Sequence, residues 1–186
     1  MRELSLHILD IIENSLEAGA SRVEAEIVED VGGEYPAHNR LTISITDNGR
    51  GMDQQTLQRV GDPFFTTRTT RHVGLGIPLF RAAAQRCDGD LVVTSQWGVG
   101  TQVVARFQWD HIDRAPLGDL KSTLLGVILF HSECDLSYRH RVDGREFAFD
   151  TAEMREALGD LSFSHPQVRT WLQEFLDGGY AELYGR

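Results

Sequence analysis

The sequence predicts an α/β fold, an α+β two-layer sandwich in which a mixed sheet is covered by helices on one face. The order of elements leads to this prediction, because residues 3–107 run helix, two strands, long loop, helix and two strands. Apolar and polar side chains alternate in the strand segments, which is typical of a sheet with one buried face. The composition changes near Trp109, so we expect one domain over residues 1–109 and a small C-terminal α+β region over residues 117–186.

The first predicted helix covers residues 3–17, where Leu9, Ile12 and Leu16 recur at helical spacing. Gly19 is suited to end this helix, since glycine readily adopts positive φ angles. Two strands with alternating apolar residues follow it, and a loop with glycines and a proline separates them. The expected elements are the strands 23–27 and 41–47, the loop 30–39 and a short helix over 53–60.

Residues 61–76 combine glycines, threonines and basic residues without periodicity, and they predict a long loop of the kind that is often functional. Pro78 suits the first turn of a helix over residues 77–86. Two further strands, 91–95 and 101–107, are expected on either side of a turn at 98–100.

The C-terminal region begins after a linker-like segment, 110–116. Residues 117–130 suit an amphipathic helix, although 124–130 could also be a buried strand. Asp143 and Gly144 form a strong hairpin signal within residues 135–150. Two further helices are expected over residues 151–158 and 165–177.

The composition excludes several classes of protein. The formal charge of −10 argues against broad binding to nucleic acid or to an anionic membrane. No apolar run approaches the roughly 20 residues that span a bilayer, and the N-terminal residues do not form a secretory signal. Two distant cysteines indicate a reducing compartment, so we expect a cytoplasmic protein. The basic segment 138–141 either docks an acidic partner or is a solvated strand.

Three motifs carry candidate chemistry. Asp10 and Asn14 are four residues apart, so both project from one face of the first helix. Asn14 offers a neutral oxygen ligand to Mg²⁺, and Asp10 could orient or deprotonate a nucleophile. Taken alone, this pair is more typical of a solvated polar stripe.

The second motif, DNGRGM, directly follows a predicted strand. Gly49 and Gly51 permit positive φ angles and close backbone approach, and the Asp47 carboxylate can accept a hydrogen bond from an exocyclic base amine. The alternative is an ordinary Asp-Asn-Gly turn.

The third motif is DPFFTTRTTRHVGLGI. Gly74 and Gly76 immediately precede a helix, so backbone N–H groups and the helix dipole could meet a phosphate there. Residues 66–73 supply hydroxyls and positive charge to a candidate lid. Alone, a Gly-x-Gly segment is also typical of a linker.

The order and spacing of these motifs, closed by GVGT at 98–101, resemble the four nucleotide-binding boxes of the GHKL ATPase superfamily over about residues 3–107. The segment ENSLEAGAS is similar to mismatch-repair ATPases, whereas DPFFTT and GLGI are more similar to histidine kinases. The resemblance implies a Bergerat-type fold that binds Mg-ATP and Mg-ADP. By the same resemblance, Asn14 matches a magnesium ligand, Asp47 an adenine-binding aspartate and Thr101 a threonine near the base. The glycines that would cradle the nucleotide are Gly49, Gly51, Gly74 and Gly76, and the neighbouring candidate contacts are Met52, Phe65, Thr66, Thr67 and Leu75.

Two features depart from the family pattern. Asp10 stands where the ATPase branches carry a water-activating glutamate, and its shorter side chain reaches less far. No phospho-accepting helix precedes the first motif, so we expect any kinase activity to act in trans on an unidentified protein partner. A slow ATPase switch and a non-catalytic nucleotide-sensing module remain alternatives. We expect no metal site at His111, His131 or His165, which lack ligand-like neighbours.

Overall fold

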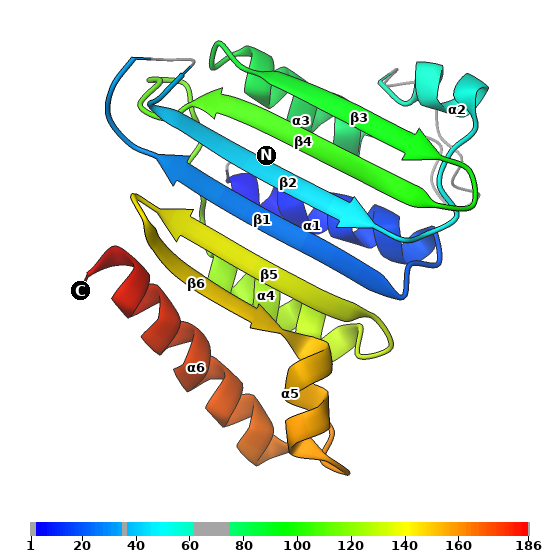
Figure 1. Ribbon diagram of the computed structural model, residues 1–186, viewed down its shortest axis with the longest axis vertical. Helices are drawn as coiled ribbons and strands as arrows, with labels where there is room; N and C mark the ends of the chain where they lie inside the picture. Colours follow the sequence, from blue (N-terminus) through cyan, green and yellow to red (C-terminus); the bar gives the residue numbers. More distant parts are fainter. Residues whose placement is uncertain (1–2, 35–36, 62–74, 186) are drawn as a thin grey trace.

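The computed structural model describes residues 3–34, 37–61 and 75–185. It contains one six-stranded sheet with the order β3-β4-β2-β1-β5-β6 (Figure 1). The strands are β1 (Arg22–Asp30), β2 (Arg40–Asp47), β3 (Asp90–Gln96), β4 (Gly100–Gln108), β5 (Asp135–Val142) and β6 (Arg145–Asp150). The predicted mixed sheet is therefore confirmed, since β1 pairs with β5 in parallel and the other neighbours pair antiparallel.

The helices α1 (Leu4–Glu17), α3 (Gly76–Gln85) and α4 (Leu120–Phe130) lie together on one face of this sheet (Figure 1). The strands turn alternate apolar side chains toward these helices. In β1 and β2, for example, Val23, Ile27 and Ile43 are each about 1% exposed. The opposite face carries polar and charged residues, which explains the strict alternation in the sequence.

The C-terminal hairpin continues the sheet, because β5 lies beside β1 along its full length. Helix α5 (Thr151–Leu158) follows β6, and α6 (Pro166–Tyr184) packs against both α4 and β6. The division at residues 1–109 and 117–186 stays an interpretation of composition. In space, both regions contribute buried residues to one hydrophobic cluster.

The structure corrects two sequence expectations for the C-terminal region. Residues 120–130 form a helix, so the alternative of a buried strand at 124–130 is wrong. Helix α6 extends beyond the predicted end at residue 177 to Tyr184. Glycine usually ends helices, but a Cβ on Gly179 would lie 2.1 Å from the Phe147 ring, so this glycine permits close packing of α6 on β6.

The basic segment 138–141 is not one surface. Because side chains alternate along β5, Tyr138 and His140 are buried, whereas Arg139 and Arg141 are exposed on the other face. The two arginines form ion pairs with Glu146 and Glu26. The four residues therefore do not act as one surface, and docking of an acidic partner to the exposed side of this strand stays a prediction.

A buried carboxylate joins the two halves of the sheet. Glu29 of β1 is 5% exposed and accepts hydrogen bonds from Trp109 Nε1 (2.7 Å), His140 Nε2 (3.0 Å) and Tyr184 Oη (2.7 Å). Burial raises the pKa of Glu29, but hydrogen bonds from His140, Trp109 and Tyr184 more than offset this and hold the pKa below its ordinary value. Three residues that are far apart in the sequence thus donate hydrogen bonds to one buried carboxylate.

The start of α1 is capped by the segment that leads into α4. The backbone N–H groups of Leu4 and Ser5 donate to the carbonyl oxygens of Pro116 (2.9 Å) and Leu117 (2.8 Å). These donors are among those that a helix N-terminus leaves without intrahelical partners. The residues that resemble a linker in composition therefore complete the first helix.

Candidate functional site

Asp47 ends β2 beside the first turn of the site. Its Oδ2 atom lies 2.8 Å from the Ser15 hydroxyl on α1. Its Oδ1 atom accepts from the backbone N–H of Gly49 at 2.9 Å and of Thr101 at 3.3 Å. The carboxylate is therefore oriented by a helix, by its own turn and by the neighbouring strand β4.

Glycines are required where the two turns of this site meet. A Cβ on Gly51, which has φ +66°, would lie 2.0 Å from the carbonyl oxygen of Gln96. A Cβ on Gly100 would lie 1.9 Å from the carbonyl oxygen of Asp47. Either contact is far inside van der Waals distance, so the turn after β2 and the β3–β4 turn approach each other as only glycine permits.

The Ser95 hydroxyl bridges the same two turns. It accepts from the backbone N–H of Met52 (2.8 Å), donates to the carbonyl oxygen of Gly100 (2.9 Å), and lies 2.9 Å from the Thr101 hydroxyl. The predicted residues Asp47, Gly49, Gly51, Met52 and Thr101 therefore form one connected cluster.

The predicted metal and catalytic residues lie together at the start of α3. A Cβ on Gly76 would lie 3.4 Å from Asn14 Nδ2 and 3.5 Å from Asp10 Cβ, so both side chains face this glycine. Both are partly buried. Asn14 directly precedes Ser15, so α1 carries both candidate residues and also orients Asp47.

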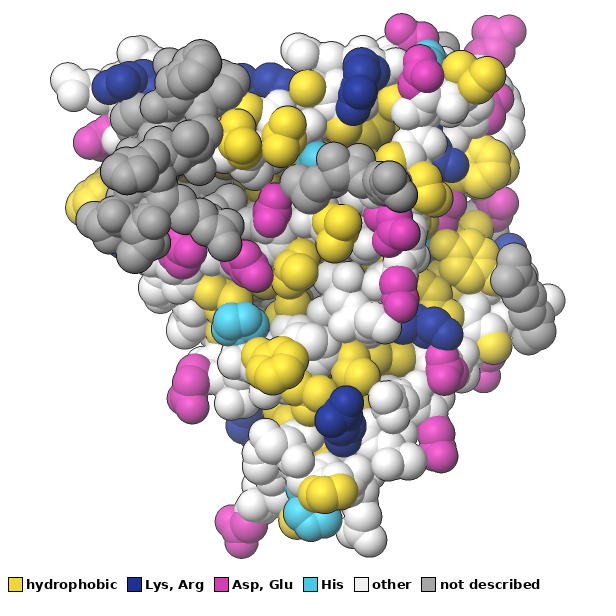
Figure 2. Space-filling view, turned by 180° about the vertical axis from the view of Figure 1, so that it is seen from behind, with side chains coloured by type: hydrophobic (Ala, Val, Ile, Leu, Met, Phe, Trp, Pro, Cys, Tyr) yellow, Lys and Arg dark blue, Asp and Glu magenta, His cyan; other side chains and the backbone are white. Residues whose placement is uncertain are grey.

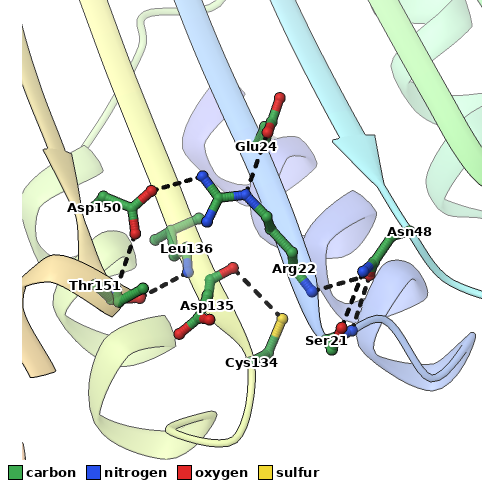
Figure 3. A network of polar contacts seen from close by, with 10 residues as sticks. Ser21, Arg22, Glu24, Asn48, Cys134, Asp135, Leu136, Asp150 and Thr151 are labelled. Atoms are coloured by element: carbon green, nitrogen blue, oxygen red, sulfur yellow. Dashed lines mark hydrogen bonds and ion pairs between the residues drawn. The ribbon is translucent and has the colours of Figure 1, made fainter. Parts of the chain in front are cut away.

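Asn48 connects the site to the C-terminal region (Figure 3). Its Oδ1 atom accepts from the backbone N–H groups of Ser21 and Arg22, each at 3.0 Å. The Arg22 guanidinium in turn donates to Asp150 at 2.6 Å, at the end of β6. A short chain of polar contacts thus runs from the turn after β2 to the start of α5.

Several predicted residues lie outside the described part of the chain, namely Phe65, Thr66, Thr67, Gly74 and the candidate lid 66–73. Leu75 is described, and it precedes α3 with 44% of its surface exposed. The predicted helix after the loop begins at Gly76. Within residues 3–34, 37–61 and 75–185, no group of three or more His, Cys, Asp or Glu side chains could hold a metal ion.

The sequence reasoning missed Ser15 and Ser95. Ser15 stands on the buried face of an amphipathic helix and is 3% exposed, and a buried hydroxyl requires a partner, which is a signal that the sequence offered. Ser95 occupies an ordinary polar position near the end of β3. Its role depends on the contact between two turns that are distant in the chain, and no local pattern indicates it.

His7 occupies α1 but not the candidate site. It is 3% exposed and stacks on the Phe80 ring at 5.0 Å, and burial lowers its pKa to about 4. Beside it lies a pocket of about 440 Å³, lined by His7 of α1, by three residues of α3 and by Arg86, and none of these is a predicted site residue. This helix-covered face shows hydrophobic side chains among scattered acidic ones (Figure 2).

No helix in the described part of the chain is long and apolar enough to cross a membrane.

The fold and the site define a GHKL-type ATPase domain. Residues 2–111 match the family described as the histidine kinase-, DNA gyrase B- and HSP90-like ATPases, and the chain belongs to this family. Its relatives include a putative sensor protein of Shewanella frigidimarina, which is 31% identical over 103 residues. Sporulation kinase C of Bacillus subtilis is 31% identical over 110 residues. These matches cover 55% and 58% of this chain, but only 15% and 24% of the two relatives.

A solved structure extends the similarity of fold beyond the family match. The Aquifex aeolicus MutL ATPase domain complexed with ADP superposes with a TM-score of 0.55 at 15% identity. The superposition covers 94% of this chain and 69% of that chain. The resemblance to the GHKL superfamily and the predicted fold class are therefore confirmed.

Proposed function

We propose that this chain binds Mg-ATP at the cluster described above and transfers the γ-phosphoryl group to a protein partner in trans. The observation that carries the proposal is the fixed orientation of Asp47. Three donors, from Ser15, Gly49 and Thr101, hold its carboxylate at the meeting point of two glycine turns. A carboxylate offers about four acceptor positions, so capacity remains for the exocyclic amine of adenine.

The residues near Gly76 suit the phosphate end of the nucleotide. Asn14 provides a hard oxygen ligand of the kind that Mg²⁺ prefers, and protein sites for this ion commonly supply one or two ligands besides the phosphates. Asp10 lies beside it at Gly76, where it would orient a nucleophile. The backbone N–H groups at the start of α3 are suited to donate hydrogen bonds to a phosphate, because the N-terminus of a helix favours negative charge. When bound, Mg²⁺ would neutralise charge on the phosphates, while α1 and α3 hold the nucleotide in position.

The acceptor in this proposal is a separate protein. His7 is the histidine within the nucleotide-binding helix, and it is buried against Phe80. The kinases among the relatives carry names such as sporulation kinase C. We propose the same broad role for this chain, signal transduction in the cytoplasm, with ADP as the nucleotide product.

A second candidate is a nucleotide-dependent switch that hydrolyses ATP slowly or not at all. The polar chain from Asn48 through Arg22 to Asp150 favours it, because a change at the turn after β2 would reach the C-terminal region. The partner would then bind the C-terminal region or the lid rather than accept a phosphoryl group.

The fate of the γ-phosphate separates these candidates. With ATP labelled at that position, we expect label on a captured partner protein. Label released to water would favour an ATPase, and binding without release would favour a sensing module.

Nucleotide binding itself is tested with Asp47→Asn. A hydrogen bond to a charged group contributes about 1.5–3 kcal/mol, so ATP affinity measured by calorimetry should fall roughly ten- to a hundred-fold. Asp90→Asn is a matched control, because it removes the same charge from the exposed start of β3, where Asp90 pairs with Arg106. Unchanged affinity in Asp47→Asn would overturn the assignment of the adenine site.

A further inference from the structure

One pocket has no role in the proposed function: the α1–α3 pocket, lined by His7, Leu79, Ala82, Gln85 and Arg86. Its volume is about 440 Å³, and binding sites for small molecules commonly measure roughly 300–1,000 Å³. Leu79, Ala82 and Gln85 recur every three residues along α3, so one face of this helix forms most of the wall. The four residues from Leu79 to Arg86 are exposed, whereas His7 is 3% exposed and forms the floor.

The floor of the pocket carries a polar atom that the protein does not satisfy. Nδ1 of His7 is fully buried and has no hydrogen-bond partner, and it is the single side-chain nitrogen or oxygen in that condition within the described part of the chain. Buried polar atoms without a partner destabilise a protein, and native structures contain few of them. A leucine or phenylalanine would fill this position without that cost, so the histidine is better explained by a partner that binds beside it.

The imidazole can offer a nitrogen to such a partner. Its ring stacks on Phe80 with the planes within 10° and the centroids 5.0 Å apart. A 180° turn about the Cβ–Cγ bond keeps the ring in this plane and exchanges Nδ1 with the carbon Cδ2 on the opposite edge. Burial lowers the pKa of His7 to about 4, so the ring is neutral at pH 7 and carries one N–H donor.

Arg86 supplies positive charge at the other end of the pocket. It directly follows α3, and no ion pair between it and a carboxylate is found among the described residues. The carboxylate of Asp88, two positions later, lies instead 3.6 Å from Nε2 of His111. Arg86 is ten residues beyond Gly76, or roughly 15 Å along the helix, so this charge lies apart from the phosphate end of the nucleotide cluster.

We propose that the α1–α3 pocket binds a small organic acid, an apolar group that carries one carboxylate. Leu79 and Ala82 contact the apolar group, the Arg86 guanidinium pairs with the carboxylate, and His7 donates a hydrogen bond to it. The amide of Gln85 adds N–H donors at the rim. None of the described lining residues is acidic, so a cation has no counter-charge there.

The test uses three probes of nearly the same shape: indole-3-acetate, the neutral indole-3-acetamide and the cationic tryptamine. Calorimetry at pH 7 measures the affinity of each, with and without saturating Mg-ATP. We expect indole-3-acetate to bind roughly ten-fold more tightly than the acetamide, because only the acetate forms a charged pair with Arg86. Tryptamine should bind most weakly. Non-specific attraction to a chain of formal charge −10 would give the opposite order.

Two variants and a control locate the site. Arg86→Gln should abolish the preference for the acetate over the acetamide, whereas Arg169→Gln removes the same charge from an exposed position of α6 and should retain it. His7→Phe keeps an aromatic ring against Phe80 but has no nitrogen, and it should weaken acetate binding several-fold. In NMR spectra of the wild type, the amide signal of Ala82 should shift on titration with the acetate.

The outcomes that contradict the inference are distinct from those that contradict ATP binding. Absence of saturable acetate binding, or binding that Arg86→Gln leaves unchanged, would overturn the proposed pocket. Displacement of the acetate by Mg-ATP would assign the probe to the nucleotide cluster and would also overturn it. A wild type that binds the acetate but not ATP would support the pocket and refute the proposed function alone.

Discussion

Glu29→Gln tests the buried carboxylate that joins β1, β5, α6 and Trp109. Glu29 Oε1 accepts from His140 and Tyr184, and Oε2 accepts from Trp109. A glutamine has the same shape but only one acceptor oxygen. If that oxygen keeps His140 and Tyr184, the amide NH₂ faces the Trp109 N–H, and two donors oppose each other in the interior.

The magnitude follows from the contacts that change. A buried donor without a partner costs about 1–3 kcal/mol, and the two remaining bonds lose their charged acceptor. We therefore expect Glu29→Gln to lower the free energy of unfolding by roughly 3 kcal/mol, a large part of the 5–15 kcal/mol typical of a domain. Trp109→Phe removes the opposed donor, so in that background Glu29→Gln should cost less by about 1–2 kcal/mol.

Urea unfolding of the four proteins in this cycle measures the coupling. Since the folded-state pKa of Glu29 is lowered, its contribution is complete above the ordinary value of 4.5 and is lost as pH falls through the lowered pKa. The wild type should thus lose stability below about pH 4.5 more steeply than Glu29→Gln does. Additive effects of the two substitutions, within about 0.5 kcal/mol, would contradict the hydrogen-bond assignment.

Three further predictions concern the site and its helix. Gly51→Ala should lower the free energy of unfolding by roughly 2–4 kcal/mol, because its Cβ would lie 2.0 Å from the Gln96 carbonyl oxygen. Gly98→Ala is the control, since its φ is also positive (+76°) but no atom lies within 4 Å, and about 1–2 kcal/mol is expected in thermal unfolding. Because the folded-state pKa of His7 is lowered from 6.5 to about 4, the unfolded state binds protons more readily as pH falls through 6.5, and stability should decline until about pH 4. His7→Phe should flatten that decline, and a slope equal to that of the wild type would show that another group causes it. Asp10→Asn should change a slow basal phosphate release little; fast wild-type release that drops roughly 10²–10⁴-fold in the variant would favour the ATPase alternative.

The elements that were predicted well are those with local signals. Periodic apolar residues in α1 and strict alternation in β1 and β2 reflect which faces are buried, so the type of these elements follows from the sequence. The bounds of α1 and β2 were predicted to within one residue, whereas β1 continues to Asp30, beyond the predicted end at residue 27. The Asp143-Gly144 turn was equally clear, because Asp143 and Gly144 both adopt positive φ angles in the hairpin.

The pairing of β1 with β5 could not be predicted, because it joins residues more than 100 positions apart, such as Val23 and Leu136. Both strands show the same alternation, and alternation does not say which strands are neighbours. The end of α6 was missed for a related reason. Gly178 and Gly179 are poor helix formers, and only contact with Phe147 of β6 explains why the helix continues.

The residues of the candidate site also fall into two groups, those that a local sequence pattern predicts and those that it does not. Asp47 and its glycines could be predicted because a turn after a strand is a local pattern. Ser95 could not, because its contacts with Met52 and Gly100 arise from the packing of one turn on another. Its partner Thr101 was identified through family resemblance, but the 2.9 Å contact between the two hydroxyls is visible only in the structure.

The cap on α1 has a practical consequence for anyone who shortens this chain. The carbonyl oxygens of Pro116 and Leu117 bind the first N–H groups of the helix that carries Asp10 and Asn14. At Gly118, a Cβ would lie 2.3 Å from a carboxylate oxygen of Glu3, so the segment before α4 packs closely against the residue before α1. A fragment that stops at residue 111, where the family match ends, would release these amides to solvent and let the helix fray from its first turn. Fragments for isotope labelling or crystallisation should therefore be cut after the helix that follows, not before it.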